Sequence, residues 1–453
     1  MAGRVQVPWE WGQVENEALE LFKKLLRIDT TNPPGNEAQI VRGILEPLLR
    51  AEGLTPEIRE EEADRANLVV RVAGNGAKRP FLLHGHLDVV AAEPARWSHP
   101  PFEAVEADGC IWGRGAIDMK QMVAMELALL LAIHRSNLPL ARDLIVACFA
   151  DEEAGSRLGS VFMAREHPEL LDAEYAIGEG GAYTLHIANR RFYPIMVAEK
   201  GFVWMKLTAR GEPGHGSIPN PDNSVVRLAR AVSALGNPYL RHEVTPVMRR
   251  FADEMAEHLG FPTGTVMRRM VHPLPFKLLR RIVFPDQRLA DAFAALVHDT
   301  VSPTILEGGR KVNQIPSEVS VWVDVRTLPG QSSDGALELI RGVVGPDLDI
   351  EVVAEGEPVV MDTRDELYEV MTRAIGSLDE GAYAVPNLLN GFTDAKPLAR
   401  LGIRTYGFAP VVLPPDIRFA AMFHGDNERI PIEGFRQGLR ALGQVVLEMC
   451  RAH

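Results

Sequence analysis

A histidine and an aspartate follow an apolar segment near the N-terminus. LLHGHLDVV places His86 and Asp88 two positions apart, so their side chains share one face of an extended chain. Asp88 could accept a hydrogen bond from the His86 imidazole and fix its tautomer while the other ring nitrogen binds a metal ion. Taken alone, the pair is weak evidence for a metal site, because a histidine near a carboxylate is most often only a structural hydrogen-bonded pair.

A second segment, FADEEAGS, follows a strand of mostly apolar residues and brings Asp151, Glu152 and Glu153 together. Like charges this close raise one another's pKa unless a cation intervenes. The glutamates could divide the chemistry, with Glu152 as a general base and Glu153 as a metal ligand. A solvated acidic loop is the alternative interpretation.

Three further residues complete the candidate set. Asp118 follows two glycines at the start of an apolar helix, where it could bridge two cations or cap the helix. Glu179 lies between glycines after another apolar strand, and His424 lies in a loop near the C-terminus. Two histidines and three carboxylates suit zinc, manganese or cobalt. A shared carboxylate would hold two ions roughly 3.5–4 Å apart, as in two-metal hydrolases.

The elements that must position these residues alternate between strands and helices. Strands are predicted at NLVVRVAG, FLLHGHLDVV and DLIVACFAD, and helices at about 14–28, 38–51 and 118–135. This alternation predicts an α/β catalytic domain with a largely parallel sheet. Ligands of such sheets bind beyond the carboxyl ends of the strands, where the candidate residues fall.

The pattern changes after about residue 199 and resumes after about residue 362. The segments between them predict a β-α-β-β-α-β unit. We therefore predict a catalytic domain in two parts, 1–198 and 357–453, and an inserted ferredoxin-like α+β lid domain at 199–356. The stretch at about 237–300, rich in Arg, Met, Phe and Pro, is interpreted as an insertion that covers the site or forms a partner surface.

Composition narrows the class of protein. The 453 residues are 46% hydrophobic and 24% charged, with a net charge of -13, which argues against a broad nucleic-acid surface. Three distant cysteines disfavour a disulfide framework and a cysteine zinc site. The N-terminus lacks the apolar core of a signal peptide, and the most apolar helix is too short for a membrane span. A cytoplasmic enzyme is therefore expected.

The motifs in their order also carry a resemblance. The chain resembles the aminoacylase, carboxypeptidase and dipeptidase superfamily of di-zinc hydrolases through HLDVV, WSHPPFEA, DGCIWGRGAIDMK, FADEEAGS, GEPGHGSIP, VNQIP, DVRTLPG, GFTDA and FHGDNERIP. The match runs in order from about residue 29 to 435. The long insertion is similar to that of the carboxypeptidase S and N-acyl amino acid hydrolase branch.

The resemblance implies a pair of metal sites. Asp118 would bridge two divalent ions, zinc first, with cobalt or manganese as the alternatives. His86 and Glu179 would complete one site, and Glu153 and His424 the other. The peptide bond after the bridging aspartate is expected to be cis.

The resemblance also implies catalytic and substrate-binding roles. Glu152 would be the general base, and Asp88 would orient the metal-binding histidine. His215 would stabilise the tetrahedral oxyanion, reaching in from the partner subunit of a homodimer. Asn313 and Arg326 would hold the free carboxylate of the substrate, since a guanidinium can grip a carboxylate through two hydrogen bonds.

The function expected is hydrolysis of the amide bond of small substrates, N-acyl amino acids or short peptides, next to a free carboxylate. One alternative is an aminopeptidase or dipeptidase of the same superfamily. The other is a catalytically silent binding protein. A further hypothesis gives the insertion an apolar acyl pocket, with a small helical core or a dimer seam as the alternative, from Met248, Phe251, Met255, Phe261, Met267, Met270 and Phe276.

Overall fold

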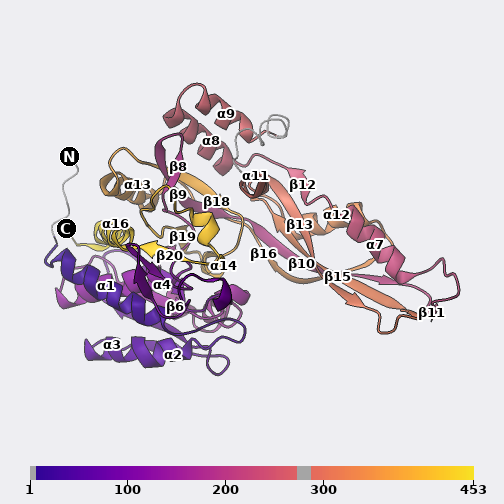
Figure 1. The fold of residues 1–453 in the computed structure, drawn as a ribbon. Helices are drawn as coiled ribbons and strands as arrows, with labels where there is room; N and C mark the ends of the chain where they lie inside the picture. The colour runs from indigo at the N-terminus through magenta and orange to yellow at the C-terminus, as the bar shows by residue number, and fades with distance from the viewer. Residues whose placement is uncertain (1–6, 273–286, 453) are drawn as a thin grey trace. The chain divides into compact units, whose positions relative to one another are not determined.

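The computed structural model describes residues 7–272 and 287–452, which form two compact units (Figure 1). Unit 1 comprises Met1–Val197, Met361–Asn387 and Thr393–His453. Unit 2 comprises Ala198–Val360 together with Leu388–Phe392. The chain therefore leaves unit 1, builds unit 2 and returns.

The sheet of unit 1 has four parallel strands at its centre, in the order β6 (Leu144–Phe149), β3 (Phe81–His86), β7 (Tyr175–Gly178) and β19 (Arg404–Gly407). These strands are short apolar runs buried on both faces, as strands covered by helices on two sides must be. Antiparallel neighbours flank them: β2 (Asn67–Val72) and β1 (Glu57–Arg59) on one side, β9 (Arg190–Glu199) on the other. The predicted α/β fold with a largely parallel sheet is confirmed.

Helices cover both faces of this sheet. α4 (Lys120–Arg135) packs on β3 and β6, and α1 (Trp11–Leu26) and α16 (Ile432–Cys450) pack on α4. α13 (Glu366–Leu378) lies beside α16 (Figure 1). A separate apolar cluster joins the sheet to α5 (Ser160–Glu166), α6 (Pro168–Leu171) and α14 (Ala395–Arg400). Within the described residues, no helix has the length and apolar character needed to cross a membrane.

The smaller elements surround these layers. β4 (Val105–Ala107), β5 (Cys110–Trp112) and β20 (Arg429–Pro431) form a three-stranded sheet. β8 (Leu185–Ile187), β17 (Val359–Val360) and β18 (Tyr383–Leu389) pair with β9 in the main sheet, and α2 (Ala38–Ile40), α3 (Glu46–Ala51) and α15 (Phe419–Met422) are short helices.

Unit 2 contains a five-stranded antiparallel sheet in the order β12 (Tyr239–His242), β13 (His298–Gly308), β15 (Glu318–Thr327), β10 (Gly201–Arg210) and β16 (Asp349–Gly356). α7 (Ser224–Ala234) and α12 (Ser333–Val344) close an apolar core with one face of the sheet. Without the edge strand β12, the strand order and the two helices are those of a ferredoxin-like unit, as expected.

The predicted insertion is largely helical where it is described. It contains β12, α8 (Pro246–Leu259), α9 (Thr263–Met270) and α11 (Gln287–Ala295), and its last residues belong to β13. A separate two-stranded ribbon pairs β11 (Gly214–His215) with β14 (Gln314–Ile315).

Candidate metal centre

The loops after three neighbouring parallel strands bring the predicted ligands together. His86 ends β3, Glu153 follows β6, and Glu179 follows β7. His86 Nε2 lies 3.0 Å from Asp118 Oδ1 and 3.8 Å from Glu179 Oε2, and all three side chains are buried. His86, Asp118 and Glu179 therefore surround one position that a cation could occupy.

Asp118 also faces the second predicted group. His424 Nε2 lies 3.1 Å from Asp118 Oδ2 and 3.1 Å from Glu153 Oε2. The two carboxylate oxygens of Asp118 thus point to different histidines, His86 and His424. This is the arrangement that a bridging carboxylate requires.

Glu152 lies at the same cluster without contacting the second histidine. Its Oε2 is 3.9 Å from His86 Nε2, and its side chain is buried. His86, Glu152 and Glu179 can bring their ligand atoms within metal-binding range of one another, as can His86, Asp118 and Glu153. Geometry therefore allows Glu152 to act either as a base or as a ligand.

Asp88 positions two parts of the cluster. His86 Nδ1 lies 3.0 Å from the backbone oxygen of Asp88 and 3.4 Å from its carboxylate. The Asp88 carboxylate accepts hydrogen bonds from the backbone N–H groups of Glu152 and Glu153, both at 3.1 Å, and from the Asn32 side chain. Asp88 therefore fixes the two glutamates as well as the histidine, a contribution that its spacing from His86 did not predict.

Asp118 is positioned by a buried residue from the far end of the chain. Glu428 accepts hydrogen bonds from the backbone N–H groups of Gly115, Ile117 and Asp118 and forms an ion pair with Arg114. The peptide bond between Asp118 and the next residue is cis, as expected. Asp118 does not cap α4, which begins at Lys120 without a side-chain cap.

Two acidic residues at the centre were not predicted from the sequence. Glu428 lies in FHGDNERIP, where only His424 had been singled out, and Asp394 lies in GFTDA. Asp394 is buried and accepts hydrogen bonds from Ser156, at 2.8 Å, and from Ser160. Burial raises the pKa of Asp394 to about 6. Both residues lie within motifs that carry the family resemblance, and this was the feature of the sequence that could have identified them.

The electrostatics of the cluster fit a bound cation. Burial raises the pKa of Glu152, Glu153 and Glu179, the last to about 8, and neighbouring carboxylates raise all three further. Hydrogen bonding to Asp118 and then to Glu153 raises the pKa of His424 to about 10. Glu153 Oε1 is buried and has no hydrogen-bond partner among the described atoms. A divalent cation would favour ionised carboxylates and neutral imidazoles here, so the donor set has the chemistry of a metal site.

Arg326, the predicted carboxylate anchor, lies near the end of β15 in unit 2. Asp324 accepts two hydrogen bonds from Arg326 Nε, at 2.8 and 3.1 Å. The guanidinium carbon lies 5.9 Å from the ring centre of Phe202 and 5.7 Å from that of Phe392. Arg326 Nη1 is buried without a hydrogen-bond partner in the described structure. The guanidinium is therefore held at one edge and has a donor available for an anion.

His215 and Asn313 share the β11–β14 ribbon of unit 2. His215 is exposed and pairs with Gln314, and the Asn313 carbonyl accepts a hydrogen bond from Gly216 at 2.9 Å. The ribbon lies beyond the Glu318 end of β15, whereas Arg326 lies eight positions along that strand. At about 3.4 Å per residue, the distance along β15 from Glu318 to Arg326 is roughly 27 Å, which is more than one small carboxylate can span. Within one chain, unit 2 does not bring Asn313 and Arg326 together.

Among the described residues of the insertion, most of the apolar side chains predicted to line an acyl pocket are buried. Met248, Phe251, Met255 and Met270 are buried, as a small helical core would require, and the acyl pocket and the dimer seam stay predictions. Phe261 is 90% exposed and Met267 is partly exposed, whereas Phe276 lies outside the described residues.

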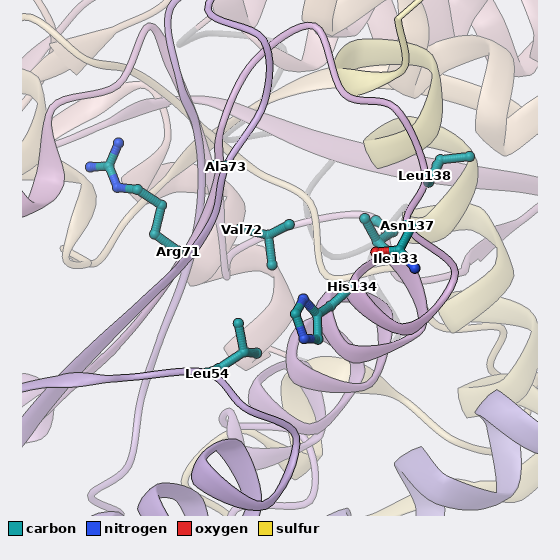
Figure 2. Close-up of a pocket in the computed structure, with 8 residues that line it drawn as sticks. All are labelled: Leu54, Arg71, Val72, Ala73, Ile133, His134, Asn137 and Leu138. Atoms are coloured by element: carbon teal, nitrogen blue, oxygen red, sulfur yellow. The ribbon is translucent and has the colours of Figure 1, made fainter.

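A surface pocket of unit 1 is separate from the metal centre. Figure 2 shows its lining residues, which come from β2, from the end of α4 and from Leu54. Its histidine, His134, contacts the backbone oxygen of Glu52. None of the predicted metal ligands lines it, so it is no part of the candidate metal centre.

Comparison with known proteins agrees with this geometry. A family model described as peptidase family M20/M25/M40 matches residues 82–448. The chain is 28% identical over 406 residues to N-fatty-acyl-amino acid synthase/hydrolase PM20D1 of Bos taurus, covering 84% of this chain and 76% of the relative. It is 24% identical over 439 residues to aminoacylase-1 of Sus scrofa, covering 95% of each. Its fold is similar to that of the M20 family metallo-carboxypeptidase Sso-CP2 from Sulfolobus solfataricus, with a TM-score of 0.70, 18% identity, and coverage of 95% and 98%.

Proposed function

The chain belongs to peptidase family M20/M25/M40, a family of metal-dependent hydrolases of amide bonds, and we propose that it cleaves N-acyl amino acids next to their free carboxylate. The observation that carries this proposal is Asp118, whose two carboxylate oxygens face His86 and His424. The similarity to an N-fatty-acyl-amino acid synthase/hydrolase and to an aminoacylase supports the substrate class.

Two metal ions would be held by the residues that surround Asp118. His86 and Glu179 would complete one site, and Glu153 and His424 the other. The mixed nitrogen and oxygen donors favour zinc, with cobalt or manganese as alternatives. When bound, such a pair supplies Lewis acidity and lowers the pKa of a water molecule toward about 7.

The remaining residues would move protons and hold the substrate. Glu152 Oε2 accepts the proton of the attacking water and passes it to the leaving nitrogen. Asp88 holds the backbone of Glu152 in place and orients His86. His215 donates a hydrogen bond to the oxyanion that forms at the amide carbon. Arg326 binds the carboxylate beside the leaving nitrogen.

A homodimer is part of the proposal. Within one chain the ribbon with His215 and Asn313 is about 27 Å along the sheet from Arg326. One small substrate could therefore meet both groups only if they come from different subunits. We propose that His215 and Asn313 of one subunit complete the site that contains Arg326 of the other.

Two alternatives are less well supported. An aminopeptidase would need an acidic group to bind a free amine where Arg326 supplies a cation, although a dipeptidase could use the same anchor. A silent binding protein would be expected to lack a ligand or the base, whereas all five ligands and Glu152 are present at one cluster.

Three buried and unpaired cysteines support a reducing compartment such as the cytoplasm.

The test is hydrolysis of a library of N-acyl amino acids and dipeptides, with metal content measured on the same sample. The proposal expects turnover of N-acyl amino acids that disappears with a chelator and returns with zinc. Turnover of dipeptides alone would favour the dipeptidase. Two bound metal ions without turnover of any library member would contradict the proposed substrate class, and no metal would favour the binding protein.

A further inference from the structure

A row of three aromatic rings leads along unit 1 to the metal centre. We call Tyr183, Phe419 and Phe423 the aromatic row. Tyr183 follows the predicted ligand Glu179 by four residues, and Phe423 directly precedes the ligand His424. The row therefore joins two segments that carry predicted metal ligands.

The rings of the row contact one another in sequence. The centroids of Tyr183 and Phe419 lie 3.8 Å apart, with the ring planes at 1°. Phe419 and Phe423 lie 5.8 Å apart, and Phe423 stacks on the His424 imidazole at 4.8 Å. A continuous aromatic surface thus ends on the imidazole whose Nε2 atom faces Asp118 and Glu153.

Part of this surface is open. Phe423 is 38% exposed, and Tyr183 and Phe419 are partly exposed. The Tyr183 phenol is uncharged at neutral pH, as the ordinary tyrosine pKa of about 10 requires, and burial raises that pKa further, to about 12. An apolar group that covers these rings removes their exposed apolar surface from water, which is favourable.

We propose that the aromatic row binds the apolar acyl group of the substrate. This inference rests on the proposed function. The amide carbonyl must lie at the metal centre, and Arg326 is the proposed partner of the carboxylate on the leaving amino acid. The acyl group is the other substituent of that carbonyl, and the row is a partly exposed apolar surface that touches the predicted ligand His424. In the described part of the insertion, the Met and Phe side chains of α8 that were predicted to line an acyl pocket are buried.

The experiment measures kcat/KM for one amino acid carrying acetyl, butanoyl, octanoyl and palmitoyl groups. Phe419→Ala and Phe423→Ala should lower kcat/KM for octanoyl substrates about tenfold and for acetyl substrates less than about twofold, because only the long chain reaches the row. Phe423→Leu keeps an apolar side chain and should recover most of the loss. Trp9→Ala, which removes a partly exposed ring that precedes α1, is the matched control and should leave the profile unchanged.

Metal content is measured for every variant, because Phe423 adjoins His424. Equal losses for acetyl and octanoyl substrates at full metal content would overturn the inference and leave the proposed function intact. A wild-type preference for acetyl over longer acyl chains would also overturn the inference and leave the proposed function intact. Failure of the wild-type protein to hydrolyse any N-acyl amino acid would remove the proposed function and this inference together.

Discussion

At the scale of single residues, Glu152 and Glu153 show how neighbours in sequence acquire different chemistry. Glu153 Oε2 contacts His424, whereas Glu152 Oε2 lies 3.9 Å from His86. Both backbone N–H groups bind Asp88, so the turn after β6 holds the two side chains toward different histidines. This division supports a ligand role for Glu153 and a base role for Glu152.

Glu152→Gln should therefore separate catalysis from metal binding. The amide cannot accept the proton of the attacking water, so kcat should fall by about 100-fold or more, the contribution expected of a general base. Metal content, measured by elemental analysis, should stay at the wild-type value. Glu169→Gln, a change at an exposed residue of α6, is the control. Full activity in Glu152→Gln would show that another group takes the proton.

Asp324 is expected to act on substrate binding through Arg326. Asp324→Asn should weaken the charge-assisted hydrogen bond that Asp324 accepts from Arg326 Nε. Because Arg326 would then be positioned less firmly for the substrate carboxylate, KM should rise about tenfold with little change in kcat. Asp349→Asn removes a partner of the exposed Arg210 and should leave KM unchanged. The assignment would be wrong if substrates with a capped, neutral carboxyl group lost activity to the same extent as free acids.

At the scale of elements, the loop before α4 depends on a residue more than 300 positions away. Glu428 binds three backbone N–H groups between Gly115 and Asp118 and pairs with Arg114. Burial raises the pKa of Glu428 to about 7, although Arg114 opposes this shift. The bridging aspartate is thus positioned by a contact between distant parts of the chain.

Glu428→Gln should loosen that loop without removing any ligand. Metal affinity should fall about 10–100-fold, the range typical of residues that support metal ligands. Titration with zinc in a competing chelator would measure the change, and circular dichroism would verify that the variant folds. Glu433→Gln, at an exposed position on α16, is the matched control. An unchanged zinc affinity would show that the loop holds its shape without the Glu428 charge.

The contrast between His86 and Glu428 explains what the sequence could predict. His86 ends one buried strand, and Glu153 and Glu179 each follow another, so periodicity and the rule for parallel sheets placed them at one edge. Glu428 and Asp394 act by accepting hydrogen bonds from groups distant in sequence, which no local pattern records. The burial of the apolar side chains on α8 and α9 could not be predicted for a similar reason. An apolar stripe on a helix does not reveal which part of the protein it faces.

At the scale of the whole molecule, the substrate-binding candidates of unit 2 occupy opposite ends of its sheet. Arg210 pairs with Glu318 at the ribbon end of β15, and Phe202 pairs with Arg326 at the other. A rigid antiparallel sheet does not bring its ends together, so His215 and Arg326 of one chain cannot serve one small substrate. The proposed homodimer resolves this separation by exchanging ribbons between subunits.

Co-expression of two inactive variants tests this arrangement. His215→Ala lacks the oxyanion donor and Glu152→Gln lacks the base, so each homodimer should be nearly inactive. A mixed dimer would combine the intact metal centre of the first subunit with His215 of the second. Random pairing should therefore restore about a quarter of wild-type turnover, because half of the dimers are mixed and each has one complete site. Purification through two different affinity tags would isolate the mixed dimer. A mixed dimer as inactive as its parents, or a protein that is monomeric by light scattering while fully active, would show that each chain completes its own site.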